Sequence, residues 1–144
     1  MKTVNQLLHV KGRDIWSVTP NTSVFDALKV MAERNIGAVL VMEGDKLAGI
    51  FSERDYARKV ILKGKSSKEM SVDEIMTEKV DCVHPSQSVR ECMTLMTDKH
   101  HRHLPVVEGG QVVGMVSIGD VVKAIISDQE FTIEQLESYI TGSR

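Results

Sequence analysis

The chain has 144 residues, 42% of them hydrophobic, 4% aromatic and 26% charged, and its net charge at neutral pH is −2. This length allows a sizeable aliphatic core, and the near-neutral charge argues against binding to nucleic acid or an anionic membrane surface. No apolar run resembles a signal peptide or approaches the roughly 20 residues of a membrane span, and two cysteines are too few for a disulfide framework, so we expect a cytoplasmic protein.

The first half of the chain predicts five elements after a short lead-in helix over residues 3–10. A strand over 15–18 ends near Pro20, and a helix begins after Ser23, which has an N-cap's spacing to the carboxylate of Asp26. Two short apolar runs, 38–42 and 47–51, flank a turn and predict a hairpin. A closing helix is expected after Ser52.

The same order recurs 65 residues later, with a strand over 80–83, a helix after Ser88, a hairpin over 104–107 and 112–116, and a helix after Ser117. Eleven positions are identical between the copies, and they fall at turns, caps and apolar sites. The sequence therefore predicts an α/β (α+β) fold of two tandem β-α-β-β-α units, over residues 1–66 and 67–144. One unit alone would be marginally stable, so we expect the copies to pack together.

Three segments lie outside the repeats. A polar, basic linker covers 63–68, and Ser71 with Glu74 predicts a helical turn. Residues 132–140 combine a capping pair with apolar positions at helical spacing, which predicts an amphipathic helix docked on this chain or on another subunit.

A Ser-x-x-Asp motif stands at the start of each closing helix, at Ser52 with Asp55 and at Ser117 with Asp120. One interpretation is a capping box, in which the serine caps the helix and the carboxylate accepts from the N-cap amide. The other is a ligand site, in which the carboxylate accepts from both ribose hydroxyls while the helix N-terminus attracts phosphate. The two roles are compatible.

With its tandem units and a Gly-hydrophobic-hydrophobic-Ser-x-x-Asp motif in each, the chain resembles the CBS domain family, named after cystathionine β-synthase. The resemblance covers nearly the whole chain. It implies a pseudo-twofold module with two clefts that bind AMP, ATP, NAD or S-adenosylmethionine as regulatory ligands. It also implies that Asp55 and Asp120 contact ribose and that Ser52 and Ser117 lie beside ribose or phosphate. The segments it places around adenine comprise Val18, Pro20, Gly37 and Ala38 in the first copy, and Val83, Pro85, His103, Leu104 and Pro105 in the second.

The copies differ where phosphate would lie, which predicts two unequal sites. Arg102 and His103 in the second copy can donate charge-assisted bonds, while Gly37 and Ala38 stand at the same positions in the first. Arg54, Arg58 and Lys59 on the first closing helix could add further bonds, although a solvated helix face explains them equally well.

Two further groups carry less weight. One group consists of potential metal ligands, namely His84, His100, His101, His103 and Cys82. Neighbouring residues on a strand point to opposite faces, and no metal-binding spacing is present, so no metal is expected. We expect Trp16 to pack in a core or an interface, with adenine stacking as the alternative.

The leading hypothesis is a non-catalytic sensor of energy or redox state that binds AMP, with ATP, ADP, NAD and S-adenosylmethionine as alternatives. It would signal to an unidentified effector protein, and the resemblance implies a homodimer. Three alternatives remain: a dimerisation scaffold with empty clefts, a nucleotide-processing enzyme and a nucleic-acid binder. No nucleophile elbow or phosphate loop supports the enzyme.

Overall fold

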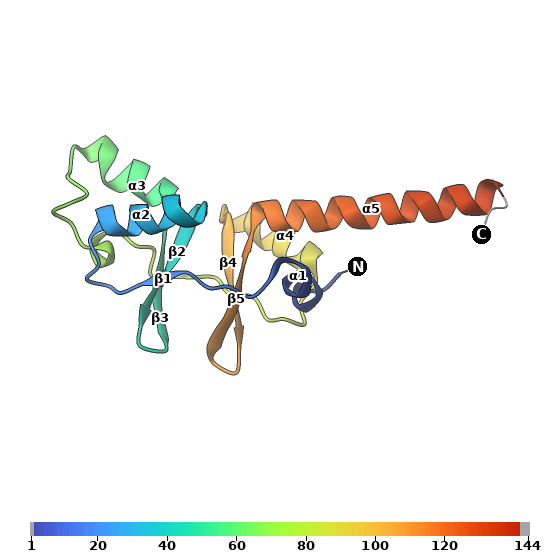
Figure 1. Cartoon of the computed structure of the whole chain (residues 1–144), viewed down its shortest axis with the longest axis horizontal. Coiled ribbons are helices and arrows are strands. Elements are labelled where there is room, and N and C mark those ends of the chain that lie inside the picture. The colour runs from blue at the N-terminus through green and yellow to red at the C-terminus, as the bar shows by residue number, and fades with distance from the viewer. Residues whose placement is uncertain (1, 142–144) are drawn as a thin grey trace. The chain divides into compact units, whose positions relative to one another are not determined.

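The computed structural model describes residues 2–141 and divides the chain into two compact units. The first-repeat unit consists of residues 14–81 and 109–112, and the second-repeat unit of residues up to 13, 82–108 and those from 113 onward. Figure 1 shows the elements of both. Across residues 2–141, no helix combines the length and apolar character needed to span a bilayer.

The first-repeat unit is a three-stranded sheet with helices. Its elements are β1 (Ser17–Val18), α2 (Val24–Arg34), β2 (Ala38–Glu43), β3 (Lys46–Ser52) and α3 (Glu53–Lys59), followed by two short 3₁₀ turns at Ile61–Lys63 and Val72–Glu74. Strand β2 is central, parallel to β1 and antiparallel to β3, as the hairpin prediction required. Phe51 is the largest fully buried side chain of its core.

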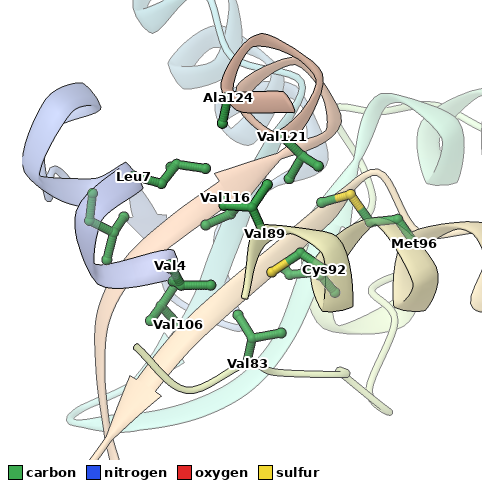
Figure 2. Close-up of a cluster of buried hydrophobic side chains, with 12 residues drawn as sticks. Val4, Leu7, Val83, Val89, Cys92, Met96, Val106, Val116, Val121 and Ala124 are labelled. Carbon is green, nitrogen blue, oxygen red and sulfur yellow. The ribbon is translucent and has the colours of Figure 1, made fainter. Parts of the chain in front are cut away.

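The second-repeat unit repeats this plan in α4 (Val89–Lys99), β4 (His103–Glu108), β5 (Gln111–Ser117) and α5 (Ile118–Thr141), and adds α1 (Val4–Lys11). The predicted N-caps hold in both repeats, because Ser23 accepts from the amide of Asp26 and Ser88 from that of Glu91. Figure 2 shows the core of this unit, in which α1, α4, α5 and the hairpin all contribute side chains.

Helix α1 packs with the second repeat and not with the first. Val4, Leu7 and Leu8 are buried in the second-repeat core, and the Val4 and Asn5 amides donate to carbonyls of Gln87 and Pro85. The structure thus divides the chain differently from the predicted boundary at residues 66 and 67. The lead-in helix joins the later repeat because its apolar face completes that core, while residues 67–81 stay with the first.

The predicted strand over 80–83 is reduced to a single parallel bridge between Val83 and Val106. In the first repeat the amide of Leu40 donates to the carbonyl of Trp16. The residue aligned with Leu40 is Pro105, which has no N–H to donate. Because this donor is missing, the parallel pairing does not extend beyond the single bridge between Val83 and Val106.

The predicted docked helix over 132–140 is wrong in its placement. Helix α5 runs without a break from Ile118 to Thr141, and the Thr132 hydroxyl donates to the carbonyl of Asp128 inside it, so Thr132 caps nothing. The apolar residues of this segment are exposed and do not dock on their own unit, with Ile133 at 53% and Leu136 at 56% exposure.

Gly49 leaves no room for a side chain, and Gly49→Ala is expected to lower the free energy of unfolding by about 1–3 kcal/mol. An added Cβ would lie 2.7 Å from the sulfur of Met76 and 2.8 Å from the carbonyl oxygen of Thr77, which is fixed by its bond from the Ile50 amide. Urea denaturation measures the loss.

The aligned glycine offers a matched control. At Gly114 an added Cβ would lie 2.9 Å from the methyl groups of Leu8, at the end of a flexible side chain. Gly114→Ala should therefore cost less, and an equal or larger loss at Gly114 would contradict the role given to the Thr77 carbonyl.

Candidate functional site

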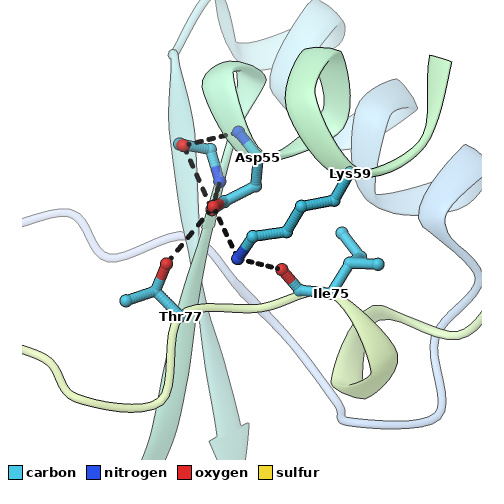
Figure 3. Close-up of polar contacts among 5 residues, drawn as sticks. Asp55, Lys59, Ile75 and Thr77 are labelled. Atoms are coloured by element: carbon cyan, nitrogen blue, oxygen red, sulfur yellow. Dashed lines mark hydrogen bonds and ion pairs between the residues drawn. The ribbon is translucent and has the colours of Figure 1, made fainter. Parts of the chain in front are cut away.

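A reciprocal capping box opens α3 in the first-repeat unit. The Ser52 amide donates to Oδ2 of Asp55 over 3.0 Å, and the Asp55 amide donates to the Ser52 hydroxyl over 3.2 Å. The carboxylate is thereby held at the junction of β3 and α3 (Figure 3). The capping interpretation of this motif is confirmed.

The other oxygen of Asp55 is also occupied. Oδ1 accepts from the Thr77 hydroxyl over 3.2 Å and lies 3.2 Å from the Lys59 ammonium, which also donates to the carbonyl of Ile75. Lys59 is one helical turn beyond Asp55, where opposite charges meet on a helix surface. Figure 3 shows this carboxylate engaged on both oxygens by groups of its own unit.

The same box opens α5 in the second-repeat unit, with a different cation. The Ser117 amide donates to Oδ2 of Asp120 over 2.8 Å, and the Asp120 amide donates to the Ser117 hydroxyl over 3.2 Å. The ammonium of Lys11, from α1, lies 2.6 Å from the same Oδ2 and 2.8 Å from the carbonyl oxygen of Met115. Ala124 stands where Lys59 stands in the first repeat, so α1 supplies the cation that α5 lacks.

Asp120 has more acceptor capacity left than Asp55. The bonds from Lys11 and the Ser117 amide both go to Oδ2, and the side chain of Asp120 is 22% exposed against 12% for Asp55. Burial by itself would raise the pKa of Asp120, but the bonds from Lys11 and Ser117 outweigh it and hold the pKa below its usual value. The carboxylate is ionised at neutral pH, and within residues 2–141 the contacts from Lys11 and the Ser117 amide leave Oδ1 for a further donor.

The backbone of Arg102 and the side chain of His103 lie near the start of α5. The carbonyl of Arg102 accepts from the Ile118 amide, just as that of Gly37 accepts from the Glu53 amide in the first repeat. Burial, reinforced by the charge of Lys11, lowers the pKa of His103. At pH 7 His103 is therefore neutral and can donate an uncharged N–H to a phosphate. The positive charge expected at the phosphate position is left to Arg102 and Lys11.

The residues expected around adenine are mostly buried. Val18 and Val83 belong to the cores of their units, as does Leu104, so their side chains are committed to packing. Ala38 is 1% exposed, Pro85 and Pro105 are also buried, and Pro20 and Gly37 are partly exposed. Any ligand contact from the buried set would have to come from the backbone.

The remaining predicted residues are placed as follows. Arg54 is partly buried and Arg58 exposed on α3. Trp16 packs on its own unit, with the Arg34 guanidinium 4.1 Å from its ring centroid. Among the described residues no three His, Cys, Asp or Glu side chains come close enough to hold a metal ion.

Two contacts of the site were not predicted. Lys59 could have been assigned to Asp55 from the four-residue spacing. Lys11 could not, because it is 109 residues from Asp120 and outside the repeat.

Comparison with known proteins gives a consistent result. The CBS domain family model matches residues 9–62 and 72–127. A putative signal-transduction protein with CBS domains from Burkholderia ambifaria MC40-6 has a structure 56% identical in sequence, covering 89% of this chain and 96% of its own, with a TM-score of 0.85. The mitochondrial CBS domain-containing protein CBSX3 of Arabidopsis thaliana is 42% identical over 97% of this chain and 72% of its own length.

A third relative carries ligands. The CBS domain pair of protein MJ0100, solved in complex with 5′-methylthioadenosine and S-adenosyl-L-methionine, is 25% identical, covers 86% of this chain and 99% of its own, and has a TM-score of 0.76. The α+β fold, the repeated units and the family matches agree with the resemblance drawn from the Ser-x-x-Asp motifs. The chain is a tandem CBS pair and belongs to the CBS domain family.

Proposed function

We propose that the chain is a non-catalytic regulatory module that binds an adenine nucleotide, AMP first, at Ser117 and Asp120 and more weakly at Ser52 and Asp55. The observation that carries the proposal is the difference between the two carboxylates. Asp120 keeps an oxygen with acceptor capacity, whereas Asp55 is engaged on both oxygens by Ser52, Thr77 and Lys59.

The start of α5 suits a ribose with a phosphate attached. Ribose hydroxyls would donate to Oδ1 of Asp120, and the helix N-terminus would attract the phosphate. The ammonium of Lys11 lies 2.6 Å from Asp120 and the charge of Arg102 acts on the neighbouring His103, so a phosphorylated nucleoside is favoured over an uncharged one. ATP, ADP, NAD and S-adenosylmethionine share the adenosine and stay as alternatives.

Nucleotide binding would act by favouring one conformation of the protein over another, within the limit set by the ligand's differential affinity. The signal of energy or redox state would pass to an effector protein or through a second copy of this chain in a homodimer. The proposed location is the cytoplasm, since two cysteines are too few for a disulfide framework.

A ligand-free scaffold is the second candidate. Each carboxylate already has an ammonium partner, so the sites are electrostatically satisfied without a nucleotide. An enzyme is a weaker candidate, because neither Asp55 nor Asp120 has a second carboxylate among its contacts to act with it.

Thermal shift separates sensor from scaffold. AMP at about 100 times its Kd is expected to stabilise the protein by about 2.7 kcal/mol, a rise of several degrees in Tm. ADP, ATP, NAD, NADH and S-adenosylmethionine complete the panel, and inosine monophosphate is the control for the adenine ring.

The Asp55→Ala/Asp120→Ala double variant should keep its fold and lose the shift. If no adenosine compound raises the Tm of the wild-type protein, the proposal is contradicted and the ligand-free scaffold is the remaining candidate.

A further inference from the structure

Helix α5 carries an exposed apolar stripe with a seven-residue repeat. The stripe, here called the seam, follows the three- and four-residue steps of a heptad and consists of Val122, Ile126, Gln129, Ile133, Leu136 and Ile140. Its apolar members are 39–79% exposed, and the exposure increases toward the C-terminal end. Apolar residues repeated every 3.5 positions are the pattern of a coiled coil.

The seam is not the face with which α5 packs on its own unit. That face includes Val121 and Ala124, which are buried, and Ile118 and Ile125, which pack against the same core. In Figure 1, α5 continues well past α1 and α4 of its own unit. The second half of the helix therefore has no cover within the unit to which it belongs.

We propose that the seam pairs with the seam of a second copy of this chain in a parallel two-stranded coiled coil. Three isoleucines occupy the first position of the heptad, and Leu136 occupies the fourth in the last repeat. β-Branched residues at the first position with leucine at the fourth favour two parallel strands. In a parallel, in-register pair each seam residue lies opposite the same residue of the other copy, so the two apolar stripes match along their whole length. We therefore expect a second copy of this chain as the partner of the seam.

Gln129 favours the parallel orientation. In a parallel, in-register pair it meets the Gln129 of the other copy, and two amides can donate to and accept from each other. An antiparallel pair can be aligned so that all other layers are apolar, but Gln129 then faces Ile133 of the other copy. The buried amide of Gln129 has no hydrogen-bond partner in that arrangement.

The flanking charges favour the same orientation. In the parallel pair Glu137 faces Thr132 and Glu130 faces Ile125 of the other copy, so like charges do not meet. In the antiparallel register Glu130 faces Glu130 at the centre of the helix, where like charges repel.

This inference rests on the self-association proposed above and names its surface, and it does not depend on nucleotide binding. Its test is the molar mass of the full chain by sedimentation equilibrium over about a hundredfold range of concentration. The wild type is expected to dimerise, and Ile133→Asp and Leu136→Asp are each expected to raise the dimer Kd at least about a hundredfold, since a buried unpaired carboxylate is costly.

Phe131→Asp is the matched control. Phe131 is 62% exposed on the same helix but lies off the seam, so this apolar-to-acidic change should leave the dimer intact. Circular dichroism checks that all three variants keep their helix content.

The outcomes are distinguishable. A wild type that is monomeric throughout overturns both the self-association and the seam. A dimer that survives Ile133→Asp and Leu136→Asp overturns the seam alone, as does a dimer that Phe131→Asp dissociates equally. None of these results bears on the proposal that the protein binds a nucleotide.

A cross-link tests the orientation. Gln129→Cys in a Cys82→Ser background leaves the new thiol and Cys92, and burial raises the pKa of Cys92 to about 11, so it stays unreactive. Mild oxidation should link Gln129→Cys chains to one another. Linkage only when they are mixed with Ile133→Cys chains in the same background would show the antiparallel arrangement instead.

Discussion

Leu8→Ala is expected to lower the free energy of unfolding by about 2–5 kcal/mol, the range for removing a fully buried leucine. Leu8 is 0% exposed and packs with Val4 in the core of the second-repeat unit. Its methyl groups also lie where a side chain on Gly114 would begin, so the truncation opens a space directly over β5. Urea denaturation followed by circular dichroism measures the loss.

Two further variants make the test specific. Val10→Ala on the same helix should change the free energy of unfolding by less than about 0.5 kcal/mol, because Val10 is 82% exposed. Gly114→Ala should cost less in the Leu8→Ala background than in the wild type, because the new methyl group enters the vacated space. If Leu8→Ala is as mild as Val10→Ala, α1 is not part of this core.

Local patterns predicted most of the elements correctly. The caps at Ser23 and Ser88 and the turns between short apolar runs are local features, and the helices and hairpins they predict are present within a residue or two. The start of each closing helix was equally predictable, because the Ser-x-x-Asp spacing determines a capping box without help from the rest of the chain.

Two of the features that were predicted wrongly or missed depend on residues distant in sequence, whereas the continuation of α5 is a local feature. The strand before Val83 is short because Pro105, some twenty residues later, cannot donate to it. The segment from Thr132 continues α5 because nothing between Asp128 and Thr132 breaks a helix, so the apparent cap is an internal hydrogen bond. Lys11 reaches Asp120 only because α1 joins the second core, and no local spacing encodes that contact.

Asp120→Ala is expected to weaken AMP binding at least about tenfold, since each hydrogen bond to a charged group contributes about 1.5–3 kcal/mol. The reason is the oxygen Oδ1, which Lys11 and Ser117 leave as an acceptor for ribose. Isothermal titration calorimetry measures the affinity. Asp55→Ala is the matched variant, and it should have the smaller effect because both oxygens of Asp55 are already engaged.

The same substitution separates binding from stability. Because Lys11 and Ser117 hold the pKa of Asp120 below its usual value, the ionised carboxylate stabilises the fold above the ordinary aspartate pKa, and this contribution disappears as the pH falls through the lowered pKa. The stability difference between wild type and Asp120→Ala should therefore be full at pH 7 and shrink in acid. If both Asp55→Ala and Asp120→Ala stay folded and bind AMP with wild-type affinity, neither carboxylate contacts the ribose, whatever each contributes to its helix.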